Sequence, residues 1–359
     1  MNILRALVNM KKRKKTKIIN VGGVKIGGNN PIAVQSMTKT DTADVKSTIR
    51  QIHSLEKSGC EIIRVAVPDM KAAEALGSIK KRINIPLIAD IHFDWRLALE
   101  AVKQGVDGLR INPGNIGAKW KIKEVVSAAK DNGLPIRVGV NAGSLEKDIL
   151  NKYKHPVPEA LVESAGRNID ILENIGFKSI KVSLKASDVS TTVDAYRLFS
   201  KKYRYPLHIG ISEAGPPSQG IIKSSVGLGI LLDEGIGDTI RVSLTSEPEE
   251  EVRVAYTILG SLGLRQRGIN IISCPTCGRT KINLKELVKK VEQHIKNINK
   301  PITVAVMGCV VNGPGEAREA DIGIAGGKGR GIIFRKGEII KSVKEEELLD
   351  CLIEELCKI

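Results

Sequence analysis

The feature that most constrains the fold is a recurring unit in which a short β-branched run precedes a longer helical segment. Eight such runs lie between about residue 30 and residue 245. After each run the chain is long enough for one crossover helix, which parallel neighbouring strands require. Eight repeats favour a closed (β/α)8 TIM-type barrel over an open sheet. The runs are 32–36, 62–67, 86–90, 108–112, 136–141, 180–185, 207–213 and 239–244.

The segments between these runs have the spacing and the end signals of helices. Residues 44–58 carry apolar side chains at helical spacing, and Gly59 follows as a stop signal. Residues 95–104 and 159–174 have the same pattern, and each ends close to a glycine. We therefore expect helices to cover the outside of the barrel.

The repeat ends near residue 265, and the rest of the chain has the pattern of a small, separate α/β domain. Its expected elements are strands over 302–307, 322–325 and 331–340 and helices over 283–297 and 344–357. The pair Lys336-Gly337 suits a hairpin turn. The expected order is a basic tail, a substrate-binding barrel and a small α/β domain, over residues 1–16, 17–265 and 266–359.

The charge of the chain indicates an anionic small molecule as ligand. The formal net charge is +16, and seven basic residues without an acid lie in the first 17 positions. We expect residues 1–16 to be a solvated tail and not an export signal, because the apolar stretch precedes the charges. No apolar run is long enough for a transmembrane helix. We expect a cytoplasmic protein with reduced thiols and with neither a membrane nor a nucleic acid as partner.

Cations and amides stand at the ends of the predicted strands, where barrels of this type carry their active sites. Guanidinium groups bind phosphate oxygens in a bidentate way, so several at one rim suit a substrate with two phosphates. Salt bridges at the barrel top are the alternative, although only Asp90 and Glu213 supply carboxylates. Glu213 is a candidate general acid or base, and His92 suits a structural or a catalytic role. The candidate ligands are Arg64, Arg110, Arg137, Lys185, Arg241, Asn112, Asn141 and Ser243.

Three cysteines in the small domain have the spacing of a metal or redox site. Cys274 and Cys277 form a Cys-x-x-Cys pair, and Cys309 follows the predicted strand 302–307. The pair alone is compatible with a redox disulfide, zinc or an iron–sulfur cluster. The third cysteine, with no histidine between 295 and 359, favours a [4Fe–4S] cluster, and zinc remains the alternative. Glu316 lies across a Gly-Pro-Gly turn and is a candidate reversible fourth ligand.

These motifs resemble those of one family, the hydroxymethylbutenyl diphosphate synthases of the non-mevalonate isoprenoid pathway. The resemblance extends from about residue 17 to residue 340, and its most specific segments are 273–278 and 308–317. Without a large insertion before the small domain, the chain looks like the shorter, two-domain bacterial form. The matching barrel segments are 31–38, 89–93, 109–115 and 137–141.

The resemblance implies a function and a role for each candidate residue. The reaction would be a two-electron reductive dehydration that opens 2-C-methyl-D-erythritol 2,4-cyclodiphosphate and gives (E)-4-hydroxy-3-methylbut-2-enyl diphosphate. The cations and amides above would hold the diphosphate, and Glu213 would serve proton transfer. The resemblance assigns the [4Fe–4S] ligands to Cys274, Cys277, Cys309 and Glu316. It also implies flavodoxin or ferredoxin as electron donor, and a homodimer in which one subunit's cluster domain closes over the other's barrel.

Two other hypotheses stay open at this point. One is a phosphate-binding barrel enzyme of the pterin-synthase type with a zinc-stabilised accessory domain, which predicts zinc, no iron and no redox activity. The other is a basic nucleic-acid-binding protein with a zinc knuckle. That protein would need aromatic side chains beside its charges, and aromatic residues are only 3% of this chain.

Overall fold

The computed structural model describes residues 13–296, 298–309 and 317–359 of the chain. The chain divides between Arg265 and Gln266 into two compact units. The first unit contains the strand–helix repeat, and the second contains the cysteine motifs. None of the helices in these described residues has the length and apolar character needed to span a membrane.

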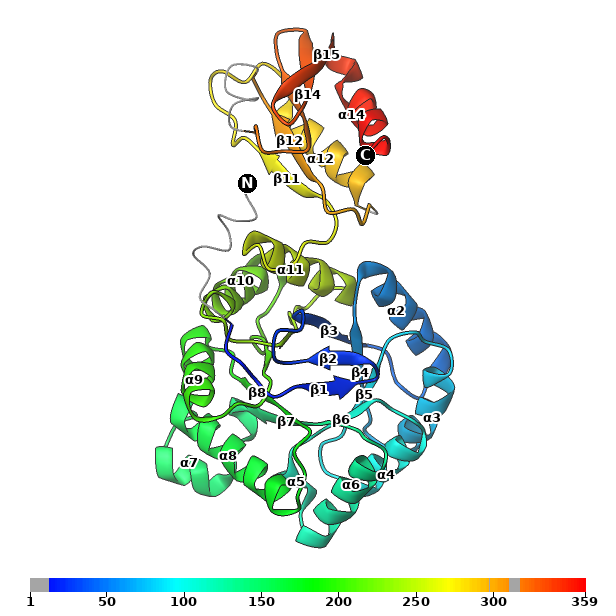
Figure 1. Cartoon of the computed structure of the whole chain (residues 1–359), viewed down its shortest axis with the longest axis vertical. Helices are drawn as coiled ribbons and strands as arrows, with labels where there is room; N and C mark the ends of the chain where they lie inside the picture. The colour runs from blue at the N-terminus through cyan, green and yellow to red at the C-terminus, as the bar shows by residue number, and fades with distance from the viewer. Residues whose placement is uncertain (1–12, 297, 310–316) are drawn as a thin grey trace. The chain divides into compact units, whose positions relative to one another are not determined.

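The first unit is a barrel of eight parallel strands, which confirms the fold expected from the repeat. The strands are ordered β8-β7-β6-β5-β4-β3-β10-β9, and a parallel bridge between Val182 and Leu207 links the two ends of this order. In Figure 1 the helices form a ring around these strands. The strands are β3 (Ala33–Met37), β4 (Ile62–Ala66), β5 (Leu87–Asp90), β6 (Gly108–Ile111), β7 (Ile136–Asn141), β8 (Ile180–Lys185), β9 (His208–Ile209) and β10 (Thr239–Ile240).

Among the barrel helices, the first has a side-chain cap at its beginning and ends at the glycine expected from the sequence. Asp44 caps the first of them by accepting a hydrogen bond from the Ser47 N–H at 3.1 Å, and Gly59 ends it with φ 99°. The helices are α2 (Val45–Ser58), α3 (Met70–Lys80), α4 (Trp95–Lys103), α5 (Pro113–Ile116), α6 (Lys119–Asp131), α7 (Lys147–Tyr153), α8 (Pro158–Asn174), α9 (Val189–Lys202), α10 (Pro217–Asp233) and α11 (Pro248–Ser261).

Two strands of the barrel are shorter than predicted. β9 and β10 have two residues each, so the later parts of the predicted runs 207–213 and 239–244 lie outside the sheet. The backbones approach closely here, because a Cβ on Gly210 would lie 2.4 Å from the carbonyl oxygen of Arg241. The candidate residues Glu213 and Ser243 consequently stand on loops beyond the strands.

A hairpin that the sequence analysis did not predict covers one end of the barrel. Its antiparallel strands are β1 (Ile19–Val21) and β2 (Val24–Ile26). Its buried side chains pack on Ala33, Ile62 and Ile88, near the beginnings of three barrel strands. Figure 1 shows the hairpin across the middle of the helix ring. Strands of three residues are too short to reveal themselves by alternation.

The described part of the expected basic tail lies on the barrel and is not solvated throughout. Arg13 forms an ion pair with Asp238 at 3.0 Å, and the Thr16 hydroxyl donates to the same carboxylate at 3.0 Å. The Lys14 N–H donates to the Gly235 carbonyl at 3.0 Å. The buried Asp238 explains the difference, because a carboxylate at this position needs partners.

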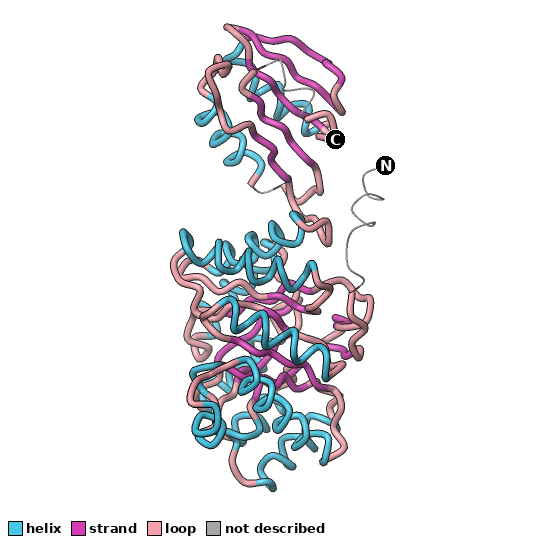
Figure 2. The backbone as a smooth tube through the Cα atoms, turned by 90° about the vertical axis from the view of Figure 1, so that its left-hand side faces the viewer, coloured by secondary structure: helices cyan, strands magenta, loops and turns pink. Residues whose placement is uncertain are grey.

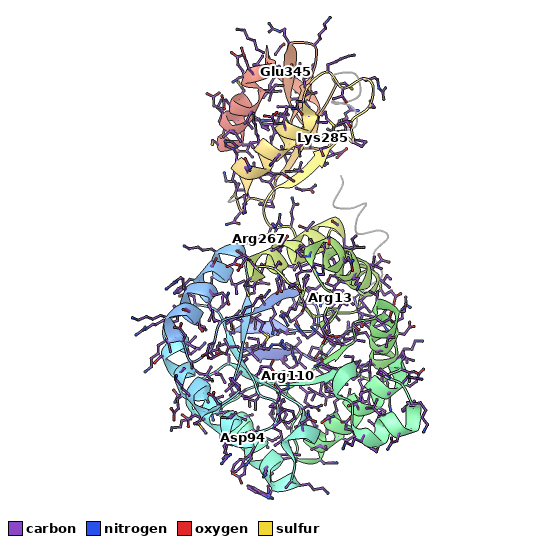
Figure 3. The ribbon with its side chains drawn as sticks, turned by 180° about the vertical axis from the view of Figure 1, so that it is seen from behind. Arg13, Asp94, Arg110, Arg267, Lys285 and Glu345 are labelled. Atoms are coloured by element: carbon purple, nitrogen blue, oxygen red, sulfur yellow. The ribbon has the colours of Figure 1, made fainter. Side chains whose placement is uncertain are left out.

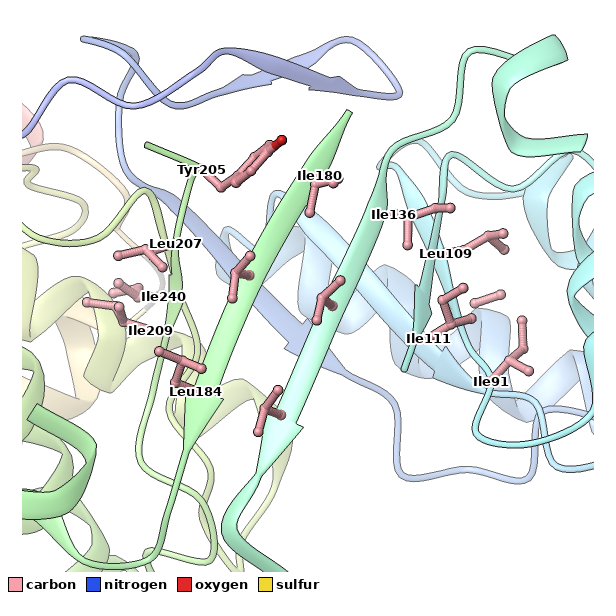
Figure 4. Packing of buried hydrophobic residues seen from close by; sticks show 14 of the residues in the cluster. Ile91, Leu109, Ile111, Ile136, Ile180, Leu184, Tyr205, Leu207, Ile209 and Ile240 are labelled. Atoms are coloured by element: carbon pink, nitrogen blue, oxygen red, sulfur yellow. The ribbon is translucent and has the colours of Figure 1, made fainter. Parts of the chain in front are cut away.

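Alternation along the barrel strands separates an apolar outer surface from a polar interior. On β8, Ile180, Val182 and Leu184 belong to the large hydrophobic cluster shared with the helices. Figure 4 shows such residues from several strands. The intervening Lys181 and Lys185 are buried without joining that cluster. Because side chains alternate in direction along a strand, these lysines face the inside of the barrel.

The second unit is a five-stranded mixed sheet with helices packed along it, shown in Figure 2. One face packs on α12 and α14 through Leu284, Val291 and Leu352, among others. The first strand had no predicted counterpart, whereas the hairpin turn at 336–337 agrees with the prediction. The elements are β11 (Asn270–Ser273), α12 (Leu284–Ile295), β12 (Thr303–Met307), β13 (Ile322–Gly326), β14 (Arg330–Arg335), β15 (Glu338–Lys344) and α14 (Leu348–Cys357).

Candidate functional site

Neighbouring strands bring charged side chains together inside the barrel. Asp90, Arg110, Arg137 and Lys181 are successive register partners across β5, β6, β7 and β8. Register partners in parallel strands project to the same face, so these four side chains share the interior. All four are at most 5% exposed. Figure 3 shows Arg110 within the ring of helices.

Asp90 holds two of the predicted guanidinium groups. Its carboxylate lies 3.3 Å from Arg64 Nε and 3.1 Å from Arg110 Nη1. Burial acts to raise the pKa of Asp90, but Arg64, Arg110 and Arg137 outweigh it and lower that pKa to about 2. Asp90 therefore remains ionised and orients the cations on both sides of it.

Two glycines make room for the cationic side chains. A Cβ on Gly139 would lie 2.5 Å from Arg110 Nε, and one on Gly210 would lie 2.8 Å from Lys185 Nζ. The Gly139 carbonyl also accepts a hydrogen bond from Arg110 Nη2 at 3.1 Å. These positions thus allow Arg110 and Lys185 to lie against the backbone of the next strand.

Several buried donors of this interior have no hydrogen-bond partner among the described residues. They include Nε of Arg110, Nε and Nη1 of Arg137, and Nε of Arg241. Burial lowers the pKa of Arg137 and of Lys185 well below the usual values, and the neighbouring arginines add to this effect. Buried cations without partners are costly, so the arrangement suits an anion with many acceptor oxygens.

A buried carboxylate that the sequence analysis missed lies near Arg241, the residue directly after β10. Glu251 on α11 is 2% exposed, and its Oε2 lies 4.0 Å from Arg241 Nη2. Its Oε1 accepts a hydrogen bond from the Leu244 N–H at 2.9 Å and lies 3.3 Å from Lys39 Nζ. No sequence signal separates Glu251 from the adjacent Glu250, because only the fold turns one carboxylate inward.

The neutral candidates and His92 lie around these cations. Asn112 is buried directly after β6, and its Oδ1 has no hydrogen-bond partner among the described residues. Asn141 and Ser243 are half-buried. His92 Nε2 lies 3.0 Å from Arg110 Nη1. Burial and Arg110 lower the pKa of His92, so the neutral ring can accept this hydrogen bond and support Arg110.

The structure places Glu213 on the loop after β9, exposed and with φ 51°. This left-handed conformation is uncommon for a residue with a Cβ and costs conformational energy. The Glu213 carboxylate forms no ion pair with the described cations. Among the described residues it is therefore not the ion-pair partner of a buried arginine.

The cysteines of the second unit follow two adjacent parallel strands. Cys274 comes directly after β11, and Cys309 lies two residues after the end of β12. The Gly308 N–H donates to Cys274 Sγ at 3.3 Å, so these two strand ends are in contact. Cys277 is exposed, and hydrogen bonds from Arg279 lower the pKa of its thiol. A thiolate is the form that binds metal.

The described residues include three of the four predicted cluster ligands. Within the described ranges, no three side chains of His, Cys, Asp or Glu are close enough together to hold a metal ion. Glu316, predicted as ligand and catalytic residue, lies outside the described residues. The donors that are described still fit an iron–sulfur cluster, because they are soft thiols that follow adjacent strands of one sheet.

Sequence comparison identifies the chain over nearly its whole length. The GcpE TIM-barrel domain matches residues 16–256, and the GcpE protein C-terminal domain matches residues 270–358. A protein of Thermodesulfovibrio yellowstonii is 66% identical, over 97% of this chain and 100% of its own length. A protein of Geobacter sulfurreducens is 60% identical, over 97% of this chain and 98% of its own. Both are named 4-hydroxy-3-methylbut-2-en-1-yl diphosphate synthase (flavodoxin).

Comparison with solved structures adds the fold alone. Dihydropteroate synthase of Yersinia pestis superposes with a TM-score of 0.50 at 13% identity, over 68% of this chain and 98% of its own. N-acetylneuraminic acid synthetase of Leptospira borgpetersenii gives 0.50 at 14% identity, over 79% and 99% of the two chains. At such identities a shared barrel says nothing about the reaction. The domain matches and the full-length relatives do, and this chain belongs to the GcpE family, as its motifs predicted.

Proposed function

We propose that this chain is a 4-hydroxy-3-methylbut-2-en-1-yl diphosphate synthase that takes its electrons from flavodoxin. The reaction is the reductive ring opening of 2-C-methyl-D-erythritol 2,4-cyclodiphosphate to (E)-4-hydroxy-3-methylbut-2-enyl diphosphate. It consumes two electrons and releases water. Relatives of this name that match over their full length support the activity. The observation that carries the substrate class is the set of buried guanidinium N–H groups inside the barrel that have no hydrogen-bond partner among the described residues.

The barrel residues would bind and orient the diphosphate. Arg64, Arg110, Arg137, Lys185 and Arg241 offer more positive charge than Asp90 and Glu251 neutralise. Phosphate oxygens would accept hydrogen bonds from these N–H groups and offset the cost of burying them. Asn112, Asn141 and Ser243 would add neutral hydrogen bonds. The anchored diphosphate would then leave the reacting carbons in a fixed position.

Glu213 would handle the proton that the dehydration requires. Its carboxylate is exposed and unpaired by the described cations, so it is accessible to a bound substrate. A positioned carboxyl group at a departing hydroxyl can donate the proton that turns it into water. The left-handed backbone at this residue supports a functional constraint, since glycine would adopt it at lower cost.

The second unit would hold a [4Fe–4S] cluster through Cys274, Cys277 and Cys309, with Glu316 as fourth ligand. The contact between Gly308 and Cys274 Sγ and the lowered pKa of the Cys277 thiol support this ligand set. When bound, the cluster would supply electrons one at a time from flavodoxin, or from ferredoxin as a second donor. We further propose that the chain works as a homodimer in the cytoplasm.

Metal content and turnover test this function together. The chain is purified without oxygen, and iron, sulfide and zinc are measured before turnover of the cyclodiphosphate with reduced flavodoxin. About four iron and four sulfide per chain with turnover are the expected result. Zinc without iron would contradict the redox function and leave a phosphate-binding barrel.

Glu316→Ala should keep most of the iron and lose turnover, because three thiolates still hold the cluster. Loss of all iron would contradict the role of Glu316 as a weak ligand.

A further inference from the structure

A lysine that does not belong to the predicted anion site is buried in the same barrel interior. Lys181 lies four residues before Lys185 on β8 and is the register partner of Arg137 on β7. It is 2% exposed, and its Nζ has no hydrogen-bond partner among the described residues. The alternation in residues 180–185 points both lysines into the barrel, and this pattern is the sequence signal that could have revealed Lys181.

The charged groups around Lys181 do little to offset the cost of burying its positive charge. Arg137 on β7 and Arg64 on β4 repel it, and Asp238 before β10 is the carboxylate that attracts it. Asp238 is already occupied, since it pairs with Arg13 at 3.0 Å and accepts from the Leu207 N–H at 2.8 Å. Lys181 is also among the cations that, together with burial, lower the pKa of His208 on β9. The Nδ1 of His208 lies 2.8 Å from Thr239 Oγ1.

We propose that Lys181 is a positioning residue of the anion site, a second layer of charge that strengthens the binding of a diphosphate by the first layer. The first layer is the predicted set Arg64, Arg110, Arg137, Lys185 and Arg241. Lys181 acts on the anion through its neighbour Arg137 and need not touch it. This inference rests on the proposed function for the class of ligand, an anion with two phosphates.

The physical reason is the balance of charge with and without the anion. Burial, followed by repulsion from Arg137 and Arg64, lowers the pKa of Lys181 to about 7. A diphosphate beside Arg137 reverses the local sign of charge and raises that pKa again. Because the pKa is then higher in the complex than in the free protein, binding takes up a proton. Affinity consequently falls as the pH rises between the two values.

Other titratable groups nearby can be separated from Lys181. Burial and the adjacent cations lower the pKa of His208 well below its ordinary value, so this ring stays neutral in the same pH range. Lys185 belongs to the first layer and is retained in every variant below. Lys178 precedes the same strand and is exposed, which makes it a matched control for loss of a lysine charge.

The test is calorimetric titration of the full-length chain with inorganic diphosphate near pH 8, in buffers of different ionisation enthalpy. The number of protons taken up is compared between the unchanged protein, Lys181→Met and Lys178→Met. The protons released by the diphosphate itself are common to all three. We expect Lys181→Met to take up roughly one proton fewer and to bind about tenfold more weakly, while Lys178→Met changes neither.

The outcomes separate this inference from the proposed function. If the unchanged protein binds diphosphate and Lys181→Met shows the same affinity and proton uptake, the inference is overturned and the anion site stands. If His208→Gln removes the uptake instead, the inference is equally overturned. If the unchanged protein binds no diphosphate, the anion site itself is wrong. Should Lys181→Met fail to fold, Lys181→Gln gives the same readout, since an amide keeps a polar group without the titration.

Discussion

The barrel interior and the cysteine-bearing edge of the second unit hold their functional groups in different ways. In the barrel, the register between β6 and β7 places Arg110 beside Arg137. Asp90 Oδ1 forms an ion pair with Arg110 Nη1 at 3.1 Å. At the edge of the second sheet, Cys277 stands on an exposed loop, and the described residues contain no assembled group of metal ligands. The fold therefore builds the anion site on paired strands, whereas Cys277 would reach a cluster from an exposed loop.

Cys277→Ser is expected to have the largest effect. It should abolish the metal site of the second unit and leave the anion site of the barrel intact. The variant should lose its cluster and all turnover, because an alcohol does not replace a thiolate ligand. Binding of inorganic diphosphate to the barrel should stay within about twofold of the unchanged protein. Iron analysis, turnover and calorimetry measure the three quantities. Cys357→Ser, an exposed cysteine on α14, serves as control. A large loss of diphosphate affinity in Cys277→Ser would show that the two sites are not independent.

Arg137→Met should separate binding from stability within the barrel. Nε and Nη1 of Arg137 have no hydrogen-bond partner in the described structure, so the variant removes a buried charge without breaking a pair. We expect kcat/KM to fall by about 100-fold or more, while the melting temperature holds or rises. Arg110→Met, which loses the bonds to Asp90 and Gly139, should lower both. A lower melting temperature for Arg137→Met would show that Arg137 also stabilises the fold, and would contradict a role in binding alone.

The sequence was sufficient for the parts of the molecule that repeat. Alternating strands, glycine stops and Asp caps repeat along the barrel, and each is a local property. Gly59 shows this, since it ends α2 as expected, whereas Asp44, expected as the first helical residue, is the N-cap. The hairpin of β1 and β2 was missed because its short strands gain their stability from contacts with Ala33, Ile62 and Ile88, which lie elsewhere in the chain.

The candidate site follows the same division. The cations could be named from the sequence, because alternation along the strands turns such residues into the barrel interior. Their level was less certain, since Arg137, expected at a strand end, is the second residue of β7. Their partners could not be named. Glu251 is reached only because α11 packs beside the barrel, and the thioether of Met37 accepts from Arg64 Nη2 at 2.9 Å only after β3 and β4 pair. Such contacts depend on tertiary structure and leave no periodic signal.

Asp90→Asn should have a moderate effect, visible in acid. The pKa of Asp90 is lowered from 3.8 to about 2 in the folded protein, so its contribution to stability is present above pH 3.8. That contribution is lost as the pH falls toward 2, and it is on the order of 2 kcal/mol. Denaturant unfolding across this range should show a smaller loss of stability with acid for Asp90→Asn than for the unchanged protein. Asp131→Asn, at the exposed end of α6, is the control. Equal slopes for Asp90→Asn and the unchanged protein would contradict the role of Asp90 as the ionised centre of the pair network.

The smallest expected effect is a change in the free energy of unfolding caused by the backbone conformation of Glu213. It tests whether a loop of the barrel, unlike its paired strands, is strained. With φ 51°, Glu213 occupies a conformation that glycine adopts at lower cost. Glu213→Gly should therefore raise the free energy of unfolding by about 0.5–1 kcal/mol, although the more flexible unfolded chain offsets part of the gain. Glu213→Gln keeps the Cβ and should leave that free energy unchanged. Both variants lack the carboxylate and should lose turnover alike, so the difference between their unfolding curves isolates the backbone. Equal stability of the two variants would mean that the loop bears no strain, and the left-handed backbone would then no longer support a functional constraint at Glu213.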